Sequence, residues 1–327
     1  MKKIFARLSA LLRRRPPAPG RFSLGRKSSL HGMLSVAMAP PWREYLLYLP
    51  RNFDTIERPA LVVWIHGCRQ EPEAFAGGTR IARYADERGF VVLLPRQTRM
   101  ANSERCWNWF DRRTARGLGE AAIVAAQTTE VIEKFGIDPG RVYLAGLSAG
   151  AGLAATLALR MPDLFTAVAL HSGIPCGAAS DPHDAGRVMA KGPLDQRTDA
   201  LALEARAAAG GNARLPALVI HGSEDPTVSP ANGNYLVRQF LLFNGVVELP
   251  PGNALPPTAT RAVHPRGFGY ILSEYYAGRR LAARLLTVPG LGHAWSGGDS
   301  AFEYADDRHP DATALVCDFF DSHRRRR

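Results

Sequence analysis

The chain of 327 residues is long enough for one α/β domain with a full core, and its composition, 46% hydrophobic and 22% charged, is ordinary for a globular enzyme. The net charge of +11 lies at the two ends: residues 1–33 hold nine Lys and Arg without an acidic residue, and residues 324–327 add four Arg. The rest of the chain carries 28 basic and 30 acidic residues, so its charge indicates no nucleic-acid partner.

The N-terminal sequence predicts neither a signal peptide nor a membrane span. Its first apolar stretch is broken by Arg7 and followed by Arg13-Arg14-Arg15, whereas a signal peptide needs roughly 7–15 apolar residues before a cleavage site. No run approaches the roughly 20 apolar residues that cross a bilayer. The cysteines lack the C-x-x-C spacing of zinc sites, so no metal is expected, while their even number permits disulfides. They are Cys68, Cys106, Cys176 and Cys317.

Residues 1–40 are rich in Pro, Ser and Arg, and we predict a flexible lead-in to a catalytic domain over residues 41–323. Short apolar runs bounded by Pro, Gly or polar residues predict buried strands. These runs are 45–49, 60–65, 90–94, 142–145, 167–171, 217–221 and 283–288. Amphipathic or Ala/Leu-rich segments predict helices. These segments are 79–87, 119–135, 151–161, 230–243 and 311–322.

The alternation of strands and helices predicts an α/β fold with a doubly wound, mainly parallel sheet and helices on both faces. Residues 245–280 are rich in Pro and Gly, which indicates an insertion or cap within the domain. Residues 324–327 are predicted to be a basic tail outside it.

A G-x-S-x-G motif, Gly146-Leu147-Ser148-Ala149-Gly150, stands between a predicted strand and a predicted helix. This context is typical of a nucleophile elbow, in which a tight turn holds the serine in a strained backbone conformation. The two glycines let neighbouring backbone pass closely, and the following helix directs its N-terminal amides at the same place. The motif therefore predicts Ser148 as a nucleophile exposed above the sheet.

A serine nucleophile needs a histidine base and a carboxylate that orients it, and the chain order for this motif is Ser, acid, His. Two predicted strands lead into such residues, Asp225 after 217–221 and His293 after 283–288. Glu224 is an alternative acid whose side chain points the other way in an extended loop, and Asp163 follows a helix rather than a strand. Histidines that fit less well, because they precede the acid or lie in the insertion or by the last helix, are His66, His171, His221, His264, His309 and His323.

The tetrahedral intermediate of acyl transfer needs two N–H donors for its oxyanion. The residue after the nucleophile supplies one, so we expect the Ala149 N–H to be a donor. The second donor is expected from the loop that follows residues 60–65, where the Cys68 N–H is best placed. The Cys68 side chain is also compatible with a packed core thiol.

Five motifs occur in one order along the chain. They are His66-Gly67-Cys68-x-Gln70, Cys106-Trp107-Asn108-Trp109-Phe110, Gly146-Leu147-Ser148-Ala149-Gly150, His221-Gly222-x-x-Asp225 and Gly292-His293-Ala294-Trp295. Together they resemble the polyhydroxybutyrate (PHB) depolymerase family of esterases, over residues 40–322. The resemblance implies an α/β-hydrolase fold and hydrolysis of short-chain hydroxyalkanoate esters or oligomers by a triad of Ser148, His293 and Asp225, with no metal or organic cofactor.

The same family includes feruloyl and acetylxylan esterases, so these activities are the first alternatives. A serine peptidase and a non-catalytic binding protein on the same fold are more distant ones. The chain departs from secreted depolymerases because it has no clear signal peptide, no Thr/Ser-rich linker with a polymer-binding domain, and a Pro-rich stretch at 245–265. These departures favour soluble esters and oligomers over crystalline polymer. Nothing in the sequence specifies an oligomeric state.

The motifs also carry three candidate substrate-binding residues, Trp107, Trp109 and Trp295, which are expected to line a groove for an acyl or alcohol group; packing around the oxyanion loop is the alternative. Cys68 and Cys106 flank the expected oxyanion loop and the aromatic loop that is expected to lie beside it. A bridge between them would fix the oxyanion loop in an oxidising compartment, whereas both stay thiols in a reducing cytosol. The resemblance favours an extracellular location, and the lack of a clear signal peptide leaves a cytoplasmic one as the alternative.

Overall fold

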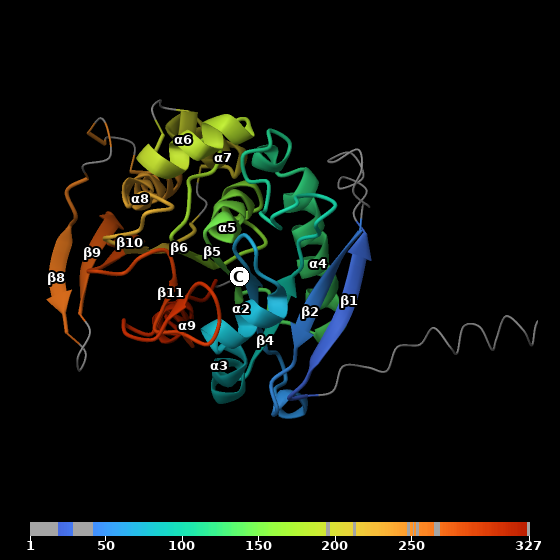
Figure 1. Ribbon diagram of the computed structural model, residues 1–327. Helices are drawn as coiled ribbons and strands as arrows, with labels where there is room; N and C mark the ends of the chain where they lie inside the picture. Colours follow the sequence, from blue (N-terminus) through green and yellow to red (C-terminus); the bar gives the residue numbers. More distant parts are fainter. Residues whose placement is uncertain are drawn as a thin grey trace, which may run out of the picture.

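A central sheet of ten strands organises the molecule (Figure 1) in the part that the computed structural model describes, residues 19–28, 42–193, 197–211, 214–246, 249–250, 252, 255–264 and 269–325. The strands of this sheet are β1 (Phe22–Ser28), β2 (Trp42–Tyr48), β3 (Ala60–Ile65), β4 (Phe90–Pro95), β5 (Val142–Leu147), β6 (Ala167–His171), β7 (Ala217–Gly222), β8 (Ala259–Val263), β9 (Tyr270–Ala277) and β10 (Arg280–Val288). Two short strands, β11 (Trp295–Ser296) and β12 (Ala305–Asp306), pair with each other.

The strand order in the sheet is β1-β2-β4-β3-β5-β6-β7-β10-β9-β8. The strands from β4 to β10 in this order are parallel, and the two outer strands on each side run antiparallel to their neighbours. Because β5, β7 and β10 are parallel, their carboxyl ends meet at one edge of the sheet. Side chains that follow these three strands are therefore brought together.

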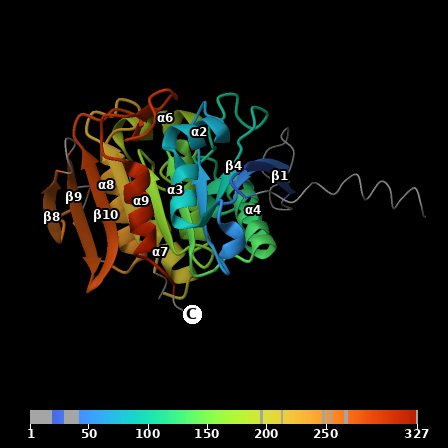
Figure 2. The ribbon, with the colours of Figure 1, turned by 90° about the horizontal axis from the view of Figure 1, so that it is seen from below.

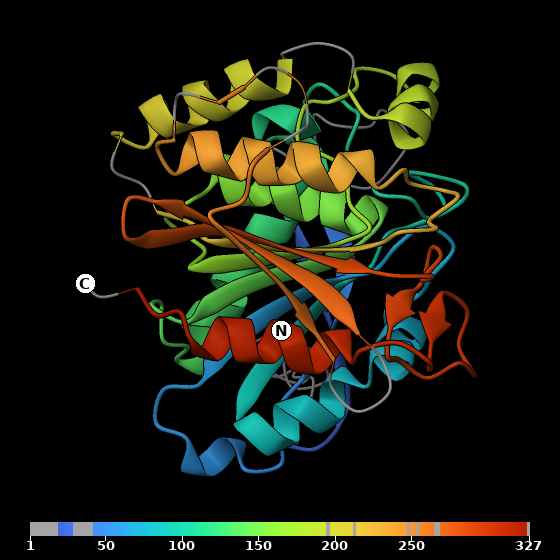
Figure 3. The ribbon, with the colours of Figure 1, turned by 90° about the vertical axis from the view of Figure 1, so that its left-hand side faces the viewer.

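Helices cover both faces of the sheet, as Figure 3 shows. They are α2 (Pro72–Thr79), α3 (Ile81–Arg88), α4 (Gly119–Phe135), α5 (Ala149–Arg160), α6 (Pro182–Lys191), α7 (Arg197–Ala208), α8 (Ala231–Phe243) and α9 (Ala312–Asp321), with 3-10 turns η2 (Phe53–Thr55) and η3 (Thr114–Arg116). One core layer contains buried residues of α4, α5 and α8, and the other contains buried residues of α2, α3 and α9. The predicted doubly wound α/β architecture is confirmed.

The central strands are buried on both faces, which explains their continuous apolar sequences. In β3, Leu61, Val63 and Ile65 contact the α4–α5 layer, whereas the alternating residues Val62 and Trp64 face the other layer. Strand side chains alternate between faces, so each apolar run contributes to both cores at once. None of the helices in the described residues has both the length and the apolar character needed to cross a bilayer.

Two predicted domain boundaries need correction, and the predicted insertion or cap is in part an extension of the sheet. β1 lies inside the predicted flexible lead-in and pairs with β2 at one edge of the sheet. The predicted insertion or cap, 245–280, contains β8 and β9, which pair with β10 and extend the opposite edge of the sheet (Figure 2). In the predicted basic tail, the Arg324 side chain pairs with Asp138 at 2.9 Å and the Arg325 guanidinium donates to main-chain carbonyls, so both residues contact the domain.

The helix predicted at 79–87 corresponds to α3, but the preceding helix α2 was not predicted. Arg80 separates the two helices, and its φ of 55° lies in the left-handed region. A non-glycine residue in that conformation interrupts the helical hydrogen bonds. Two short helices instead of one therefore follow the loop that carries Gly67 and Cys68.

Candidate active site

Ser148 occupies a strained turn between β5 and α5. Its φ of 55° and ψ of −122° are unusual for a residue with a side chain. A Cβ at Gly146 would lie 2.5 Å from the Gly150 carbonyl carbon, and one at Gly150 would lie 2.3 Å from the Ile65 carbonyl oxygen. Glycine at both positions is therefore what allows the turn to close. Ser148 is only 7% exposed, so it lies deeper than the sequence predicted.

The structure brings Asp225 and His293 into direct contact. Asp225 follows β7, His293 lies in the loop after β10, and the His293 Nδ1 to Asp225 Oδ2 distance is 2.8 Å. The two loops are joined by main-chain bonds, including one from the Glu224 N–H to the Leu291 carbonyl at 3.1 Å. This bond keeps the histidine loop in register with the acid.

Asp225 is held in place by both of its carboxylate oxygens. Oδ1 accepts hydrogen bonds from the N–H groups of Thr227 at 2.9 Å and Val228 at 2.8 Å, which leaves Oδ2 for His293. Burial raises the pKa of Asp225, yet the hydrogen bond and charge of His293 and the N–H of Val228 hold that pKa below its ordinary value. The acid is therefore ionised at neutral pH and suited to orienting the imidazole.

A short chain of contacts joins Ser148 to the His293 loop. The Ser148 N–H donates to the His171 carbonyl at 2.9 Å. The His171 ring in turn accepts a hydrogen bond at Nε2 from the N–H of Ser296, three residues after His293, at 3.2 Å. Serine, histidine and aspartate thus share one edge of the sheet.

The alternative residues for acid and base are placed elsewhere or are already engaged. Glu224 is exposed, and Asp163 lines a cavity of about 650 Å³ together with residues from the amino ends of β6, β7 and β10. His66, His171 and His221 are buried, and His309 bonds Asp306. His264 and His323 lie by β8 and α9, respectively.

The loop after β3 lies directly against the nucleophile turn. A Cβ at Gly67 would lie 3.5 Å from the Ser148 Cβ, so the next residue, Cys68, is close to the reacting position. The Cys68 N–H has no acceptor among the described residues. Ala149 is the first residue of α5, where N–H groups lack an acceptor within the helix. Both N–H groups are thus available beside Ser148.

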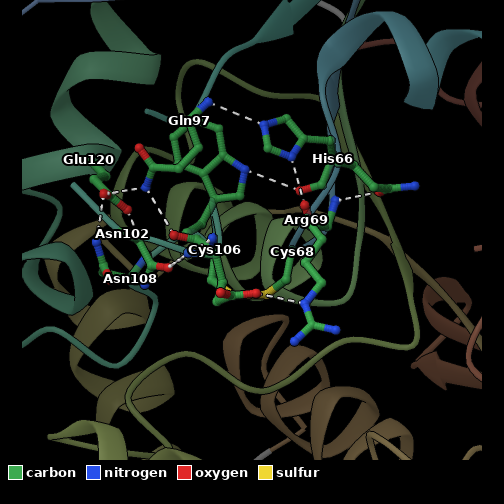
Figure 4. The surroundings of a disulfide bond; sticks show 12 residues. His66, Cys68, Arg69, Gln97, Asn102, Cys106, Asn108 and Glu120 are labelled. Carbon is green, nitrogen blue, oxygen red and sulfur yellow. Dashed lines mark hydrogen bonds and ion pairs between the residues drawn. A yellow bond between two sulfur atoms is a disulfide. The ribbon is translucent and has the colours of Figure 1, made fainter. Parts of the chain in front are cut away.

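Cys68 and Cys106 form a disulfide, so of the two states that the sequence allows for these cysteines the structure has the bridged one (Figure 4). The bridge joins the loop after β3 to the loop that carries Trp107 and Asn108. A main-chain bond from the Arg69 N–H to the Glu104 carbonyl, 2.7 Å long, and a side-chain ion pair between the same residues run beside it. The two loops therefore form one connected wall of the site.

The three tryptophans expected to line a groove are core residues instead. Their exposed fractions are 0% for Trp107, 3% for Trp109 and 1% for Trp295. The Trp107 indole donates to the His66 carbonyl and the Trp295 indole to Thr313 Oγ1, while Trp109 lies against Gly152 of α5. The packing alternative accounts for all three, because each indole fills the space behind a loop of the site.

Sequence reasoning missed a polar network behind the disulfide, formed by the buried His66, Gln97 and Glu120 and the half-buried Asn108. One signal was present. Glu120 and Gln127 of α4 stand seven residues apart on the stripe that also contains Ile123 and Val131, and all four are buried. A charged residue on the apolar stripe of a helix indicates a buried partner, because an unpaired buried charge is costly.

Several known esterases are similar to this chain. Poly(3-hydroxyalkanoate) depolymerase C of Paucimonas lemoignei is 34% identical over 71% of this chain, a match that spans about half (54%) of the depolymerase. Acetylxylan esterase A of Emericella nidulans is 29% identical over 68% of this chain and 71% of that protein. The solved structure of an acetyl xylan esterase from Aspergillus awamori superimposes with a TM-score of 0.69 at 21% identity, covering 91% of this chain and 99% of that one, which shows a shared fold.

The Esterase PHB depolymerase family model matches residues 43–260, which include the loop after β3, the nucleophile turn and Asp225. The matched region covers more than half of the chain and contains the parallel strands from β3 to β7. This protein is therefore a member of the Esterase PHB depolymerase family, on an α/β-hydrolase fold.

Proposed function

We propose that this protein is a serine esterase that hydrolyses short-chain hydroxyalkanoate esters or their oligomers through an acyl-enzyme. The observation that carries the proposal is the 2.8 Å hydrogen bond between His293 Nδ1 and Asp225 Oδ2, at the sheet edge where the strained Ser148 turn lies. Family membership supports the class of reaction, and the depolymerase relative supports the class of ester.

The proposed reaction begins with attack of Ser148 Oγ on the ester carbonyl carbon. His293 Nε2 takes the serine proton, because Asp225 holds the Nδ1–H tautomer and leaves Nε2 as the base. The N–H groups of Cys68 and Ala149 stabilise the oxyanion of the tetrahedral intermediate. The intermediate collapses to the acyl-enzyme and the alcohol, which takes the proton from His293. Water then attacks the acyl carbon while His293 takes its proton, and His293 gives that proton to Ser148 Oγ as the acid is released.

The test is turnover of p-nitrophenyl acetate and butyrate by the wild-type protein and by Ser148→Ala. We expect kcat to fall by about 10⁴ or more in the variant, with its circular dichroism and melting temperature close to wild type. Near-normal esterase activity in folded Ser148→Ala would contradict the proposed mechanism. A noncatalytic binding protein would show no turnover in either form.

Acetylated or feruloylated plant polymers are the second candidate substrates, and the acetylxylan esterase relative supports them because the match spans 71% of that protein. A panel of 3-hydroxybutyrate oligomers, acetylated xylan and methyl ferulate separates the branches by kcat/KM. The highest value is expected for the oligomers. A preference for acetylated xylan or methyl ferulate would keep the triad and change the substrate.

We also propose an extracellular location, which the Cys68–Cys106 disulfide supports because structural disulfides persist in oxidising compartments. Protein isolated from its native cells is denatured and treated with a maleimide reagent. Two labelled thiols, Cys176 and Cys317, are expected. Four labelled thiols would place the protein in a reducing compartment.

A further inference from the structure

Glu120 is a buried carboxylate that the proposed chemistry does not use. It is the second residue of α4, it is 1% exposed, and it accepts three hydrogen bonds. The donors are the Asn108 main-chain N–H at 2.7 Å, Asn108 Nδ2 at 2.8 Å and Gln97 Nε2 at 2.5 Å. Burial raises the pKa of Glu120, and these donors and the charge of the buried Arg43 oppose that rise. A buried carboxylate with three donors fixes the groups that bond it.

One set of contacts runs from Glu120 through Gln97 to the loop after β3. The Gln97 side chain also donates to the Cys106 carbonyl at 3.0 Å, and the Gln97 main-chain N–H donates to His66 Nε2 at 3.2 Å. His66 Nε2 is therefore an acceptor, so the ring proton is on Nδ1 and is donated to the Gly67 carbonyl at 2.7 Å. This donation fixes the peptide group that joins Gly67 to Cys68.

A second set of contacts runs through Asn108 to the other half of the disulfide. Glu120 holds both the main chain and the side chain of Asn108, two residues after Cys106. Cys106 is bonded to Cys68, and the Asn102 side chain accepts from the Cys106 N–H at 3.3 Å. Figure 4 shows Glu120, Gln97 and His66 on one side of the bridge and Asn108 and Asn102 close to Cys106. Both sets of contacts end at Cys68.

Building on the proposed esterase function, we propose that Glu120 is a positioning residue for the oxyanion donor. Its carboxylate holds Gln97 and Asn108, and through them His66 and Cys106, so that the Cys68 N–H stays where an ester oxyanion forms. Gly67 lies against Ser148, so a small displacement of this loop changes the distance between donor and oxyanion. Oxyanion stabilisation depends on donors about 2.7–3.1 Å from the developing charge.

The test compares an ester with its thionoester, p-nitrophenyl acetate and its C=S analogue, in wild type and Glu120→Gln. Glutamine keeps the shape of the side chain but presents an NH₂ group to one of the three donors. We expect kcat for the ester to fall about 10- to 100-fold while KM changes less than about 3-fold, because a displaced donor costs somewhat less than a deleted one. Sulfur is larger and accepts hydrogen bonds weakly, so the ratio of ester to thionoester rates is expected to fall as well.

Asp138→Asn is the matched control. Asp138 is also a buried carboxylate with three donors, namely the Gly140 N–H, Arg141 Nε and Arg324 Nη2, but it precedes β5 at the opposite edge of the sheet. This variant is expected to lower the melting temperature and to leave kcat and the rate ratio unchanged. An unchanged rate ratio in folded Glu120→Gln would overturn the positioning role, whatever happens to its melting temperature.

If Glu120→Gln does not fold, Asn108→Ala carries the same test. It removes the side-chain donor to Glu120, together with the bonds of that side chain to Asn102 and Ala101, and leaves the donors to Glu120 from Gln97 and from the main chain. A lower rate ratio in that variant supports the proposal. Loss of folding in both variants, or an unchanged ratio in Asn108→Ala, would assign the network to stability alone. Full turnover in folded Ser148→Ala is a separate outcome: it overturns the esterase mechanism first and this inference with it.

Discussion

His221 Nε2 lies 3.6 Å from Asp225 Oδ2, the same oxygen that bonds His293 at 2.8 Å. The His221 proton is used elsewhere, because Nε2 donates to the Val228 carbonyl at 2.9 Å. Its Nδ1 has no partner among the described residues, and a Cβ at Gly233 would lie 3.1 Å from it. Burial lowers the pKa of His221, so its ring is neutral, and the hydrogen bond to Asp225 Oδ2 comes from His293.

This arrangement predicts very different results for the two histidines. His293→Ala is expected to lower kcat for p-nitrophenyl butyrate by about 10⁴ or more, and Asp225→Asn to lower it severely by stabilising the wrong imidazole tautomer. His221→Asn keeps the triad and is expected to stay within about 10-fold of wild type. Steady-state kinetics on folded proteins make the comparison. A loss in His221→Asn as large as that in His293→Ala would mean that the base has been misassigned.

The disulfide predicts a linked loss of stability and rate on reduction. The bridge closes a loop with a sequence separation of 38 residues, so its loss is expected to lower the free energy of unfolding by about 3–4 kcal/mol. Reduction also breaks one of the links that hold the loop after β3, while the hydrogen bond between His66 and Gln97 remains. We therefore expect kcat to fall, but far less than in Ser148→Ala.

Urea unfolding and turnover with and without dithiothreitol measure both effects of reduction. The control is the double variant with serine at positions 68 and 106, Cys68→Ser with Cys106→Ser, in which dithiothreitol is expected to change nothing further. An equal effect of dithiothreitol on that variant would trace the loss to another group.

Two buried histidines predict a loss of stability in mild acid. Burial lowers the pKa of His66 to about 4 and that of His171 to about 3, whereas both titrate near 6.5 when unfolded. Between these values the unfolded chain binds protons that the folded chain does not, so the free energy of unfolding falls as pH falls. The expected slope is about 1.4 kcal/mol per pH unit for each histidine between about pH 6.5 and 4.

Urea unfolding between pH 7.5 and 4.5 measures this slope. His171→Asn is expected to be less stable at neutral pH, since it loses its bonds to Ser172 and Ser296. Its free energy of unfolding is also expected to fall less steeply with pH, by about 1.4 kcal/mol per pH unit, because one titrating histidine is gone. Equal slopes in the variant and in wild type would show that His171 is not the titrating group.

The parallel part of the sheet was predictable because its strands bury both faces. The runs 60–65 and 167–171 were predicted with the bounds that the structure has, and helix α4 was predicted as Gly119–Phe135. The sheet edges were not predictable in the same way. β1 and β8 carry several exposed side chains and are held by pairing with distant partners, so their local sequences lack a continuous apolar run. α6 was missed although Asp181 and Pro182 give the N-terminal signal that it has.

For the site, chain order and strand ends were enough to select Asp225 and His293, which the structure brings together. Side-chain direction was not predictable, and the tryptophans show why. Trp107 and Trp295 each send their N–H to a buried acceptor, His66 and Thr313, that lies 41 and 18 residues away in sequence. A motif indicates which loops meet at the site, but the packing behind the loops decides which of their side chains face the substrate.

Glycine-to-alanine substitutions in the nucleophile turn, at Gly150, and in α6, at Gly186, are expected to have opposite outcomes. A Cβ at Gly150 would lie 2.3 Å from the Ile65 carbonyl oxygen and 2.4 Å from that of His66, so Gly150→Ala must displace the oxyanion loop from α5. We expect it to lower the free energy of unfolding by about 1–3 kcal/mol and to lower kcat through the displaced donor. Gly186, in α6, has no atom within 4 Å of an added Cβ, so Gly186→Ala is expected to raise stability by up to about 1 kcal/mol without changing kcat. Urea unfolding and ester turnover on the two variants decide the matter, because equal effects would show that close packing at Gly150 is not what restricts this position to glycine.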